Sequence, residues 1–414
     1  MIQILNREKF VRTSVVLLFI AYLGFFSLGL PDAAHGVNWP FVKASFSLPI
    51  GWLGLVIAAG GVGYLMSSFS VGYWMNRLGV GQLLAVSSAI VSCGLLGFYF
   101  STSFLIFMLF SALIGLGSGA IDAGLNTYAA EHFSTRHMNW LHAAFGVGAT
   151  AGPVIITTVL VSFSQNWRLG YAVLGLILLF VSLVFLFSRH LWESDQHKAI
   201  NVDTNQSDSN KLDTTKALTE RVTQRQALKP PIILTQIAFF FVYAGVEIGV
   251  GQWAFTVMTE LRGISVANAG IWVAVYWGFL ALGRIVFGVL VERFSVEHLL
   301  RLCLLGMVFG AFLFTLNATP YTSYLGLVLI GFCAAPIFPC MISQTAKLVG
   351  KHYAIHAVGF QMSAGVIGAM TLPFLSGVLG DWLGLGFVSL TFVLYAIVLF
   401  GLFQWIVRQA AESA

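Results

Sequence analysis

The feature that most constrains this chain is a series of long apolar stretches that recur along its whole length. A transmembrane helix needs about 20 consecutive, mostly apolar residues. Each of these stretches has about that length or more and is nearly free of Asp, Glu, Lys and Arg. Twelve are predicted, at 11–37, 50–75, 80–100, 103–130, 138–163, 168–190, 232–259, 266–291, 297–317, 321–346, 353–378 and 384–408. Because they are continuously apolar rather than alternating in polarity, they exclude a β-barrel. The sequence therefore predicts an all-α membrane protein with twelve transmembrane helices.

Composition indicates a chain dissolved in lipid rather than in water. Of its 414 residues, 58% are hydrophobic and 9% are charged, whereas soluble domains carry about 25% charged residues. One soluble globule has too little interior to bury so much apolar surface. The sequence contains no nucleophile–base pair, no cofactor loop and no metal-ligand spacing, so we expect no enzymatic activity, no cofactor and no metal site.

The basic residues predict the orientation in the membrane. Of the 21 Lys and Arg residues, 17 lie in helix ends and loops on the side of the N-terminus. Lys43, Arg168 and Arg262 lie on the other side, and Arg284 lies within a helix. This bias predicts a multi-pass protein of the cell inner membrane with both termini in the cytoplasm. It also accounts for the net charge of +5, so no nucleic-acid partner is expected.

A polar segment at 193–229 divides the chain. It has mixed charge and no aromatic residue, so it cannot build a core. We interpret it as a cytoplasmic linker between an N-terminal six-helix half, 1–192, and a C-terminal six-helix half, 230–414.

The two predicted halves resemble each other at three places. Residues 72–79 (GYWMNRLG) correspond to 288–295 (GVLVERFS), and Asp32 corresponds to Glu247. The stretch from His142 to Pro153 corresponds to the one from Gln361 to Pro373 within one residue. Internal repeats of this kind are typical of transporters, whose binding sites lie between the repeats near the middle of the bilayer.

These motifs resemble a known family. Gly72, Asn76 and Arg77, with the second copy Gly288, Glu292 and Arg293, resemble the cytoplasmic-loop signature of the major facilitator superfamily, with Asn76 in place of the usual acid. The segments 115–131, 141–153, 245–253 and 276–284 resemble its fucose permease and sodium-dependent glucose transporter branch. The resemblance implies two pseudo-symmetric six-helix bundles, alternating access, and a role in conformational gating for the six loop residues.

Three acids lie inside predicted helices: Asp32, Asp122 and Glu247. Because an acid at a helix centre costs about 2.5–3.5 kcal/mol, ion coupling is the leading explanation and a structural pair is the alternative. Arg284, which lies within a predicted helix, is the cation that could form such a pair. The resemblance implies that acids of the first and fourth helices, here Asp32 and Asp122, serve in proton coupling and sugar contact. The coupling ion is left open between proton and sodium.

Amides and aromatic rings near these acids suit a sugar site, which combines a few placed polar groups with flat apolar walls. Asn126 lies one helical turn from Asp122 on the same face. The glycines at 115, 117, 119 and 124, on the opposite rows of the same helix, are expected to let a neighbouring helix approach closely. Trp39, Trp167 and Trp382 are expected in an interfacial belt. The predicted substrate-binding residues are Asn38, Asn126, His142, Gln252, Trp253, Tyr276 and Gln361.

The sequence thus favours symport of a neutral sugar or polyol with a proton or sodium ion, by a protein expected to be a monomer in the lipid bilayer. No cation is expected deep in the pathway, which disfavours anionic solutes. A proton-driven exporter or a flippase of amphipathic compounds is the alternative. The same acids would serve it, and some of the 36 Phe and 10 Met residues would line an adaptable apolar cavity. A receptor or scaffold without transport is disfavoured, because it has little use for repeat-related acids.

Overall fold

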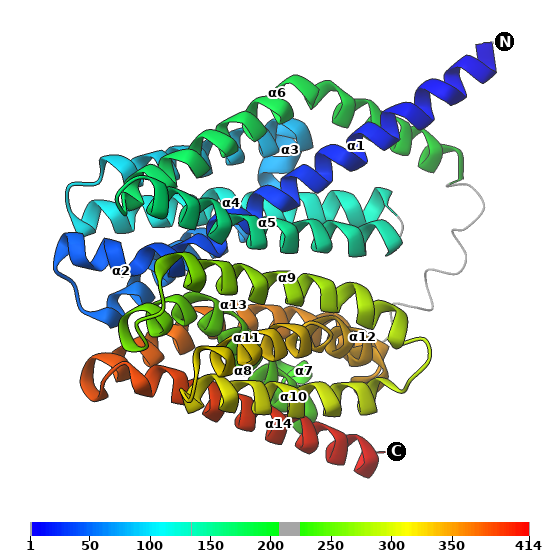
Figure 1. Cartoon of the computed structure of the whole chain (residues 1–414). Coiled ribbons are helices and arrows are strands. Elements are labelled where there is room, and N and C mark those ends of the chain that lie inside the picture. Colours follow the sequence, from blue (N-terminus) through cyan, green and yellow to red (C-terminus); the bar gives the residue numbers. More distant parts are fainter. Residues whose placement is uncertain (1, 134, 207–223, 414) are drawn as a thin grey trace. The chain divides into compact units, whose positions relative to one another are not determined.

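The computed structural model describes residues 2–133, 135–206 and 224–413, and these are almost entirely helical (Figure 1). The elements are α1 (Ile2–Asp32), α2 (Ala34–Phe46), η1 (Ile50–Trp52), α3 (Leu53–Phe100), α4 (Phe104–His132), α5 (Thr135–Ser162), α6 (Trp167–Gln206), α7 (Gln224–Ala227), α8 (Pro231–Thr256), η2 (Val257–Leu261), α9 (Val266–Leu290), α10 (Val296–Leu316), α11 (Pro320–Ala334), α12 (Ile337–Val349), α13 (Lys351–Leu383) and α14 (Gly386–Ser413). Of the predicted linker, 193–206 continues α6, whereas 207–223 lies outside the described residues.

Eleven helical stretches of the described chain are long and apolar enough to cross a membrane. One of them, Ile50–Phe100, has 51 residues. At about 1.5 Å per residue, it is more than twice as long as a bilayer core of about 30 Å is thick. Its backbone breaks at Gly79, where φ is 72° and ψ is 164°, a conformation that glycine adopts without strain. This stretch therefore provides two crossings, and the predicted all-α fold of twelve transmembrane helices is confirmed.

The first crossing differs from its predicted span of 11–37. α1 ends at Asp32, and a second helical piece, α2, continues to Phe46. Asn38 and Pro40 follow the predicted end of this span, but both residues are buried inside α2. Packing of α2 against α8 keeps the chain helical beyond the apolar stretch. The predicted boundary is therefore too early.

The chain forms two compact units. Unit 1 comprises residues 1–32, 59–148 and 168–219. In it α3 and α4 lie in close contact: a Cβ atom on Gly115 would be 1.8 Å from the carbonyl oxygen of Gly60, and one on Gly119 would be 2.3 Å from that of Tyr64. The predicted close helix approach at these glycines is confirmed, but their predicted position opposite the polar residues of α4 is wrong. Tyr64 of α3, whose backbone lies against Gly119, also bonds to Asp122, so α3 packs on the face of α4 that carries the polar residues.

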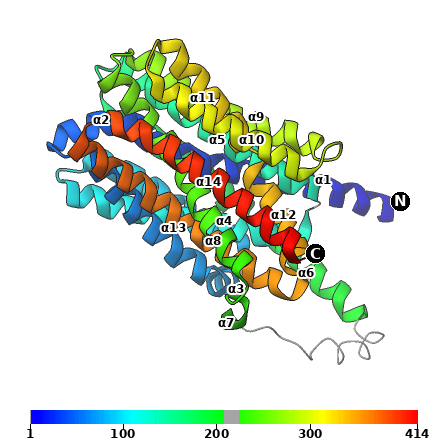
Figure 2. The ribbon, with the colours of Figure 1, turned by 90° about the horizontal axis from the view of Figure 1, so that it is seen from below.

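Unit 2 comprises residues 33–58, 149–167 and 220–414. Within it α8 packs against both α13 and α14 (Figure 2), and α10 packs against α11 and α14. α2 packs against α8, and η1 packs against α13. Unit 2 therefore contains segments from both predicted halves of the sequence. The predicted halves are divided at the polar segment 193–229, whereas the two units are defined by contacts in space. The boundaries of the halves stay a prediction.

Candidate functional site

The best-organised polar group in unit 1 surrounds Asp122 of α4. The side-chain amide of Asn126 donates a hydrogen bond to Asp122 Oδ1 over 2.9 Å, and the hydroxyl of Tyr64 donates one to Asp122 Oδ2. Asp122 and Asn126 share one helix face, as the sequence predicts, and both are half-buried. Asp122 therefore accepts hydrogen bonds from two neutral donors, one on its own helix and one on α3.

Tyr64 reaches Asp122 because α3 and α4 meet along a seam of small residues. The side chain of Ser68 donates a hydrogen bond of 3.3 Å to the carbonyl oxygen of Gly119. A Cβ atom on Gly119 would collide with the backbone of Tyr64, so only glycine permits this separation. This close contact thus fixes the position of Tyr64 along the axis of α4 and brings its hydroxyl to the carboxylate of Asp122.

Asp32 is the last residue of α1 and is exposed where the chain breaks between α1 and α2. Its carboxylate is close enough to Asp122 for the two charges to interact, and Tyr64 interacts with both. Unit 1 thus brings together two of the three predicted ion-coupling acids. We call Asp32, Tyr64, Asp122 and Asn126 the acid cluster.

His142 of α5 lies in the same unit and is exposed. Its ring meets that of Phe25, on α1, edge to face at 5.3 Å between centroids. Its repeat partner, Gln361 of α13, is instead fully buried in unit 2. There the Gln361 amide donates to Gln236 over 2.9 Å and accepts from the hydroxyl of Thr345 over 3.1 Å. The two repeat-related polar residues therefore have different surroundings in this structure.

The third predicted acid, Glu247 of α8, forms an ion pair. Arg284 Nη2 of α9 lies 3.3 Å from Glu247 Oε1, with the two side chains 19% and 12% exposed. The hydroxyl of Tyr276 donates a hydrogen bond of 2.8 Å to the backbone oxygen of Glu247. Arg284 is the cation that the sequence offers for a structural pair, and the structure shows that pair at Glu247.

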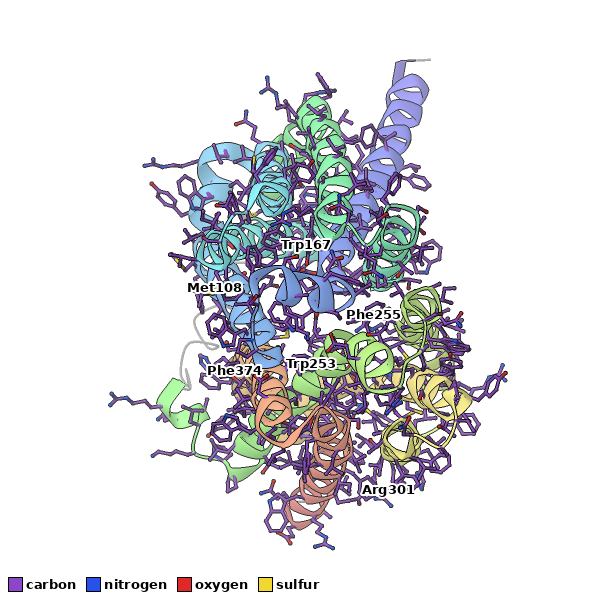
Figure 3. All side chains as sticks on the ribbon, turned by 60° about the vertical axis from the view of Figure 1, so that its left-hand side comes forward. Met108, Trp167, Trp253, Phe255, Arg301 and Phe374 are labelled. Atoms are coloured by element: carbon purple, nitrogen blue, oxygen red, sulfur yellow. The ribbon has the colours of Figure 1, made fainter. Side chains whose placement is uncertain are left out.

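Three further predicted substrate-binding residues are buried where α2 meets α8. Trp253, labelled in Figure 3, donates its indole N–H to the backbone oxygen of Pro373 over 2.9 Å. Gln252 is buried, and a Cβ atom on Gly36 of α2 would be 2.5 Å from its backbone oxygen. Asn38 is fully buried, and its side-chain amide has no hydrogen-bond partner among the described residues. Tight helix packing encloses all three here.

Two of the tryptophans expected in an interfacial belt are buried instead. Trp39 and Trp167 are 1% and 4% exposed. Their indole N–H groups donate to the backbone oxygen of Ile50 and to the hydroxyl of Ser45, over 2.9 and 2.8 Å. The belt assignment is wrong for these two residues, because tertiary contacts within unit 2 supply the polar partner that an interface would otherwise provide. Trp382 is 80% exposed, as a belt residue would be.

The six loop-signature residues lie at exposed positions. Gly72, Asn76 and Arg77 precede the break at Gly79, and the guanidinium of Arg77 lies 4.7 Å from the ring centre of Tyr73. Gly288 lies near the end of α9, and Glu292 and Arg293 lie in the turn that follows. Their gating role stays a prediction. In the part of the chain that the structure describes, His, Cys, Asp and Glu residues form no cluster suited to a metal ion.

Sequence reasoning missed Tyr64 and Gln236, the partners of Asp122 and Gln361. Gln236 is an amide within the apolar stretch 232–259, which was a usable signal. Tyr64 lies among small and apolar residues, and nothing in its neighbourhood marks it. Such pairings depend on which helices face each other, which a local pattern does not reveal.

Comparison with known proteins points to one family. The sequence matches the Major Facilitator Superfamily over residues 14–265 and 252–413. Bypass of stop codon protein 6 of Saccharomyces cerevisiae is 24% identical over 75% of the chain, and the match spans 65% of that protein, less than two thirds of its length. The glucose/mannose transporter GlcP of Bacillus subtilis is 22% identical over 86% of both chains. A crystal structure of a variant of the nucleoside transporter NupG shares the fold, with a TM-score of 0.76 at 13% identity over 95% of this chain and 99% of that one.

Proposed function

The chain belongs to the Major Facilitator Superfamily and has the helices of a multi-pass membrane protein, and we propose that it is a transporter that carries a neutral sugar or polyol together with a proton or a sodium ion. In this proposal, the protein works by alternating access, opening the site first to one side of the membrane and then to the other.

The observation that carries the proposal is the acid cluster. A carboxylate inside a membrane protein that is exposed to each side in turn is suited to take up a cation on one side and release it on the other. The hydrogen-bond partners of Asp122 are the neutral groups of Tyr64 and Asn126. Binding of a cation to Asp122 therefore leaves no opposite charge unpaired, which would be costly in a site poor in water. We assign ion coupling to Asp32 and Asp122; Glu247, predicted with them, is already paired with Arg284.

The residues near the cluster support a hydroxylated, uncharged solute. Carboxylate, amide and phenol groups pair with sugar hydroxyls, and aromatic rings cover the C–H faces. The similarity to a relative named a glucose/mannose transporter supports the same class. Asn126 and His142 are at least partly exposed in this structure, so we assign them the first solute contacts. The other predicted contacts, Asn38, Gln252, Trp253, Tyr276 and Gln361, are buried and would meet a solute only after unit 2 opens.

We further propose a monomer in the cell inner membrane with both termini in the cytoplasm. The support is the concentration of Lys and Arg on the side of the N-terminus. A reporter fused after Ala414 that is active only in the cytoplasm should be active. A reporter active only outside the cytoplasm, fused at the same place, should be silent; the reverse pattern would contradict this orientation.

Uptake of a panel of radiolabelled hexoses into proteoliposomes tests the function, with proton and sodium gradients imposed in turn. The wild type should accumulate at least one hexose under one gradient, and Asp32→Asn should not. Glu131→Gln serves as the matched control, because Glu131 is an exposed acid near the end of α4. Absence of hexose uptake in vesicles that hold folded protein would contradict the proposal and favour an exporter or flippase.

A further inference from the structure

One carboxylate of unit 2 joins two segments that lie far apart in sequence. Asp381, near the end of α13, accepts hydrogen bonds from the backbone N–H groups of Ile50 and Gly51, in η1. Its Oδ1 lies 2.7 Å from the Ile50 nitrogen, and its Oδ2 lies 2.8 Å from the Gly51 nitrogen. Each oxygen thus holds one amide at the start of the helical stretch that continues as α3. We call this contact the distal latch.

The distal side is the side of unit 2 on which α8 ends. Successive crossings alternate in direction, so α9 runs back from that side, α10 runs toward it, α11 and α12 run back, and α13 runs toward it again. Asp381 therefore lies on the distal side, opposite to the side on which α8 begins.

Backbone contact brings Asp381 within reach of the amides. A Cβ atom on Gly51 would be 2.9 Å from the carbonyl carbon of Gly377, and one on Gly377 would be 2.7 Å from Gly51 Cα. A Cβ atom on Gly54 would be 2.4 Å from Phe374 Cβ, and Phe374 is labelled in Figure 3. Three glycines thus let η1 and the first turn of α3 lie directly on α13, and Asp381 closes the end of this contact.

The sequence around Asp381 repeats the pattern at the end of α9. Residues 377–381 read GVLGD, and residues 288–292 read GVLVE: Gly-Val-Leu, one further residue, then an acid. Each six-helix half of this superfamily contains two inverted three-helix repeats. The crossings made by α9 and α13 are the second helices of these two repeats, so they occupy equivalent places on opposite sides of the membrane. Asp381 is therefore the distal equivalent of Glu292, in the loop signature.

We propose that the distal latch is a gating contact: Asp381 holds η1 against α13 and keeps the distal end of unit 2 closed, and its two hydrogen bonds break when that end opens. The inference deepens the proposed function and rests on it, because alternating access requires such an opening. Segments held together by packing and by these two hydrogen bonds can separate without breaking either helix.

A graded series of variants tests the latch, because each oxygen holds a different amide. Asp381→Ala removes both acceptors, Asp381→Asn keeps one, and Asp381→Glu keeps two. Asp381 acts as a cap, because it accepts hydrogen bonds from the first backbone N–H groups of η1. Asp381→Ala removes this cap and should raise the ratio of distally open to distally closed protein roughly two- to thirtyfold. Asp381→Asn should fall between Asp381→Ala and the wild type, and Asp381→Glu should stay near the wild type.

The ratio is read from spin-label distances in the full chain, in nanodiscs without solute or ion gradient. Labels go on S47C, in the turn after α2, and T319C, before α11, with the four native cysteines replaced by alanine. Both label positions are exposed and belong to unit 2. Glu297→Gln is the matched control, because Glu297 pairs only locally with Arg301, at 2.8 Å, and is likewise exposed.

We expect the long-distance population to increase most in Asp381→Ala, less in Asp381→Asn and little in Asp381→Glu. It should not change in Glu297→Gln. The same distances in the wild type, Asp381→Ala and Asp381→Asn would overturn the proposal, as would Asp381→Glu opening as far as Asp381→Ala. If Asp381→Ala does not fold, the Asn and Glu variants decide. Because no solute is present, this result is independent of whether the protein transports hexoses.

Discussion

The acids of the two units are held in different ways, although two of them occupy equivalent places in the repeat. In unit 1, Asp122 accepts hydrogen bonds from the neutral groups of Tyr64 and Asn126, and Asp32 lies nearby at a helix break. In unit 2, Glu247, the repeat equivalent of Asp32, lies in mid-helix and pairs with Arg284. The same kind of residue thus has neutral partners in one unit and a cationic partner in the other.

This difference bears on which acid can bind a cation. If Glu247 lost its charge, Arg284 would be left as an uncompensated cation among helices, which is strongly unfavourable. If Asp122 lost its charge, Tyr64 and Asn126 would stay neutral and could reorient. We therefore expect the coupling cation to bind in the acid cluster, and we expect the Glu247–Arg284 pair to hold α8 and α9 together.

The largest effect is expected from Asp122→Asn, which keeps the shape of the side chain and removes its charge. Accumulation of solute against its gradient should disappear, whereas exchange of labelled for unlabelled solute across the membrane should persist. Both are measured in proteoliposomes, with Glu131→Gln on the same helix as control. Loss of both activities would mean that Asp122 binds the solute or stabilises the fold.

The next largest effect is expected from breaking the ion pair of unit 2 on one side. Arg284→Gln should lower the free energy of unfolding by about 2–3 kcal/mol, somewhat less than a fully buried pair would lose, because part of both side chains is exposed. The double variant Arg284→Gln, Glu247→Gln should recover part of that loss. Thermal unfolding in detergent measures both; equal losses in the single and double variants would mean that the pair is not coupled.

Tyr64→Phe should have a smaller effect, on ion binding rather than on folding. It removes the hydroxyl that donates to Asp122, so the ionised carboxylate loses stabilisation relative to the cation-bound form. The apparent affinity for the coupling ion should rise about ten- to a hundredfold, as expected for one hydrogen bond to a charged group. The dependence of uptake on external pH or sodium concentration measures this change, and an unchanged or weaker affinity would contradict it.

The smallest effect is expected from a partly exposed ion pair of unit 2 that joins the end of α2 to η2. Lys43 Nζ lies 3.0 Å from Glu260 Oε1, with the side chains 18% and 31% exposed. Because such pairs contribute about 0–1 kcal/mol, Glu260→Gln should open the distal end less than Asp381→Ala does. The spin-label pair on Ser47 and Thr319 reports both variants; a larger opening for Glu260→Gln would reverse the ranking of these two contacts.

Much of the fold could be predicted because a bilayer requires long, uninterrupted apolar stretches, which are easy to recognise in a sequence. The apolar stretches predict the helices, and the glycines of α4 predict the close contact with α3 that the structure shows at Gly115 and Gly119. The i, i+4 spacing of Asp122 and Asn126 predicts their shared face, and the structure adds their hydrogen bond. These features depend on residues near one another in sequence or on the bilayer itself.

The remainder depended on tertiary contacts that no local pattern encodes. The partners Tyr64 of Asp122 and Gln236 of Gln361 come from other helices. The burial of Trp39 depends on its bond to the backbone of Ile50, across a turn that the sequence did not place. In each case the residue type was visible in the sequence, but the helix that faces it was not.

The central claim, that the coupling cation binds in the acid cluster, is tested most directly by measuring the accumulation of solute by two variants, each reconstituted separately into proteoliposomes of the same composition. Asp122→Asn is compared with the double variant Arg284→Gln, Glu247→Gln under the same imposed gradient, after both are shown to be folded. If the coupling cation binds in the acid cluster, Asp122→Asn should only equilibrate the solute, whereas the double variant should still concentrate it. Accumulation that survives in Asp122→Asn and is lost in the double variant would contradict the account and move the coupling site to unit 2.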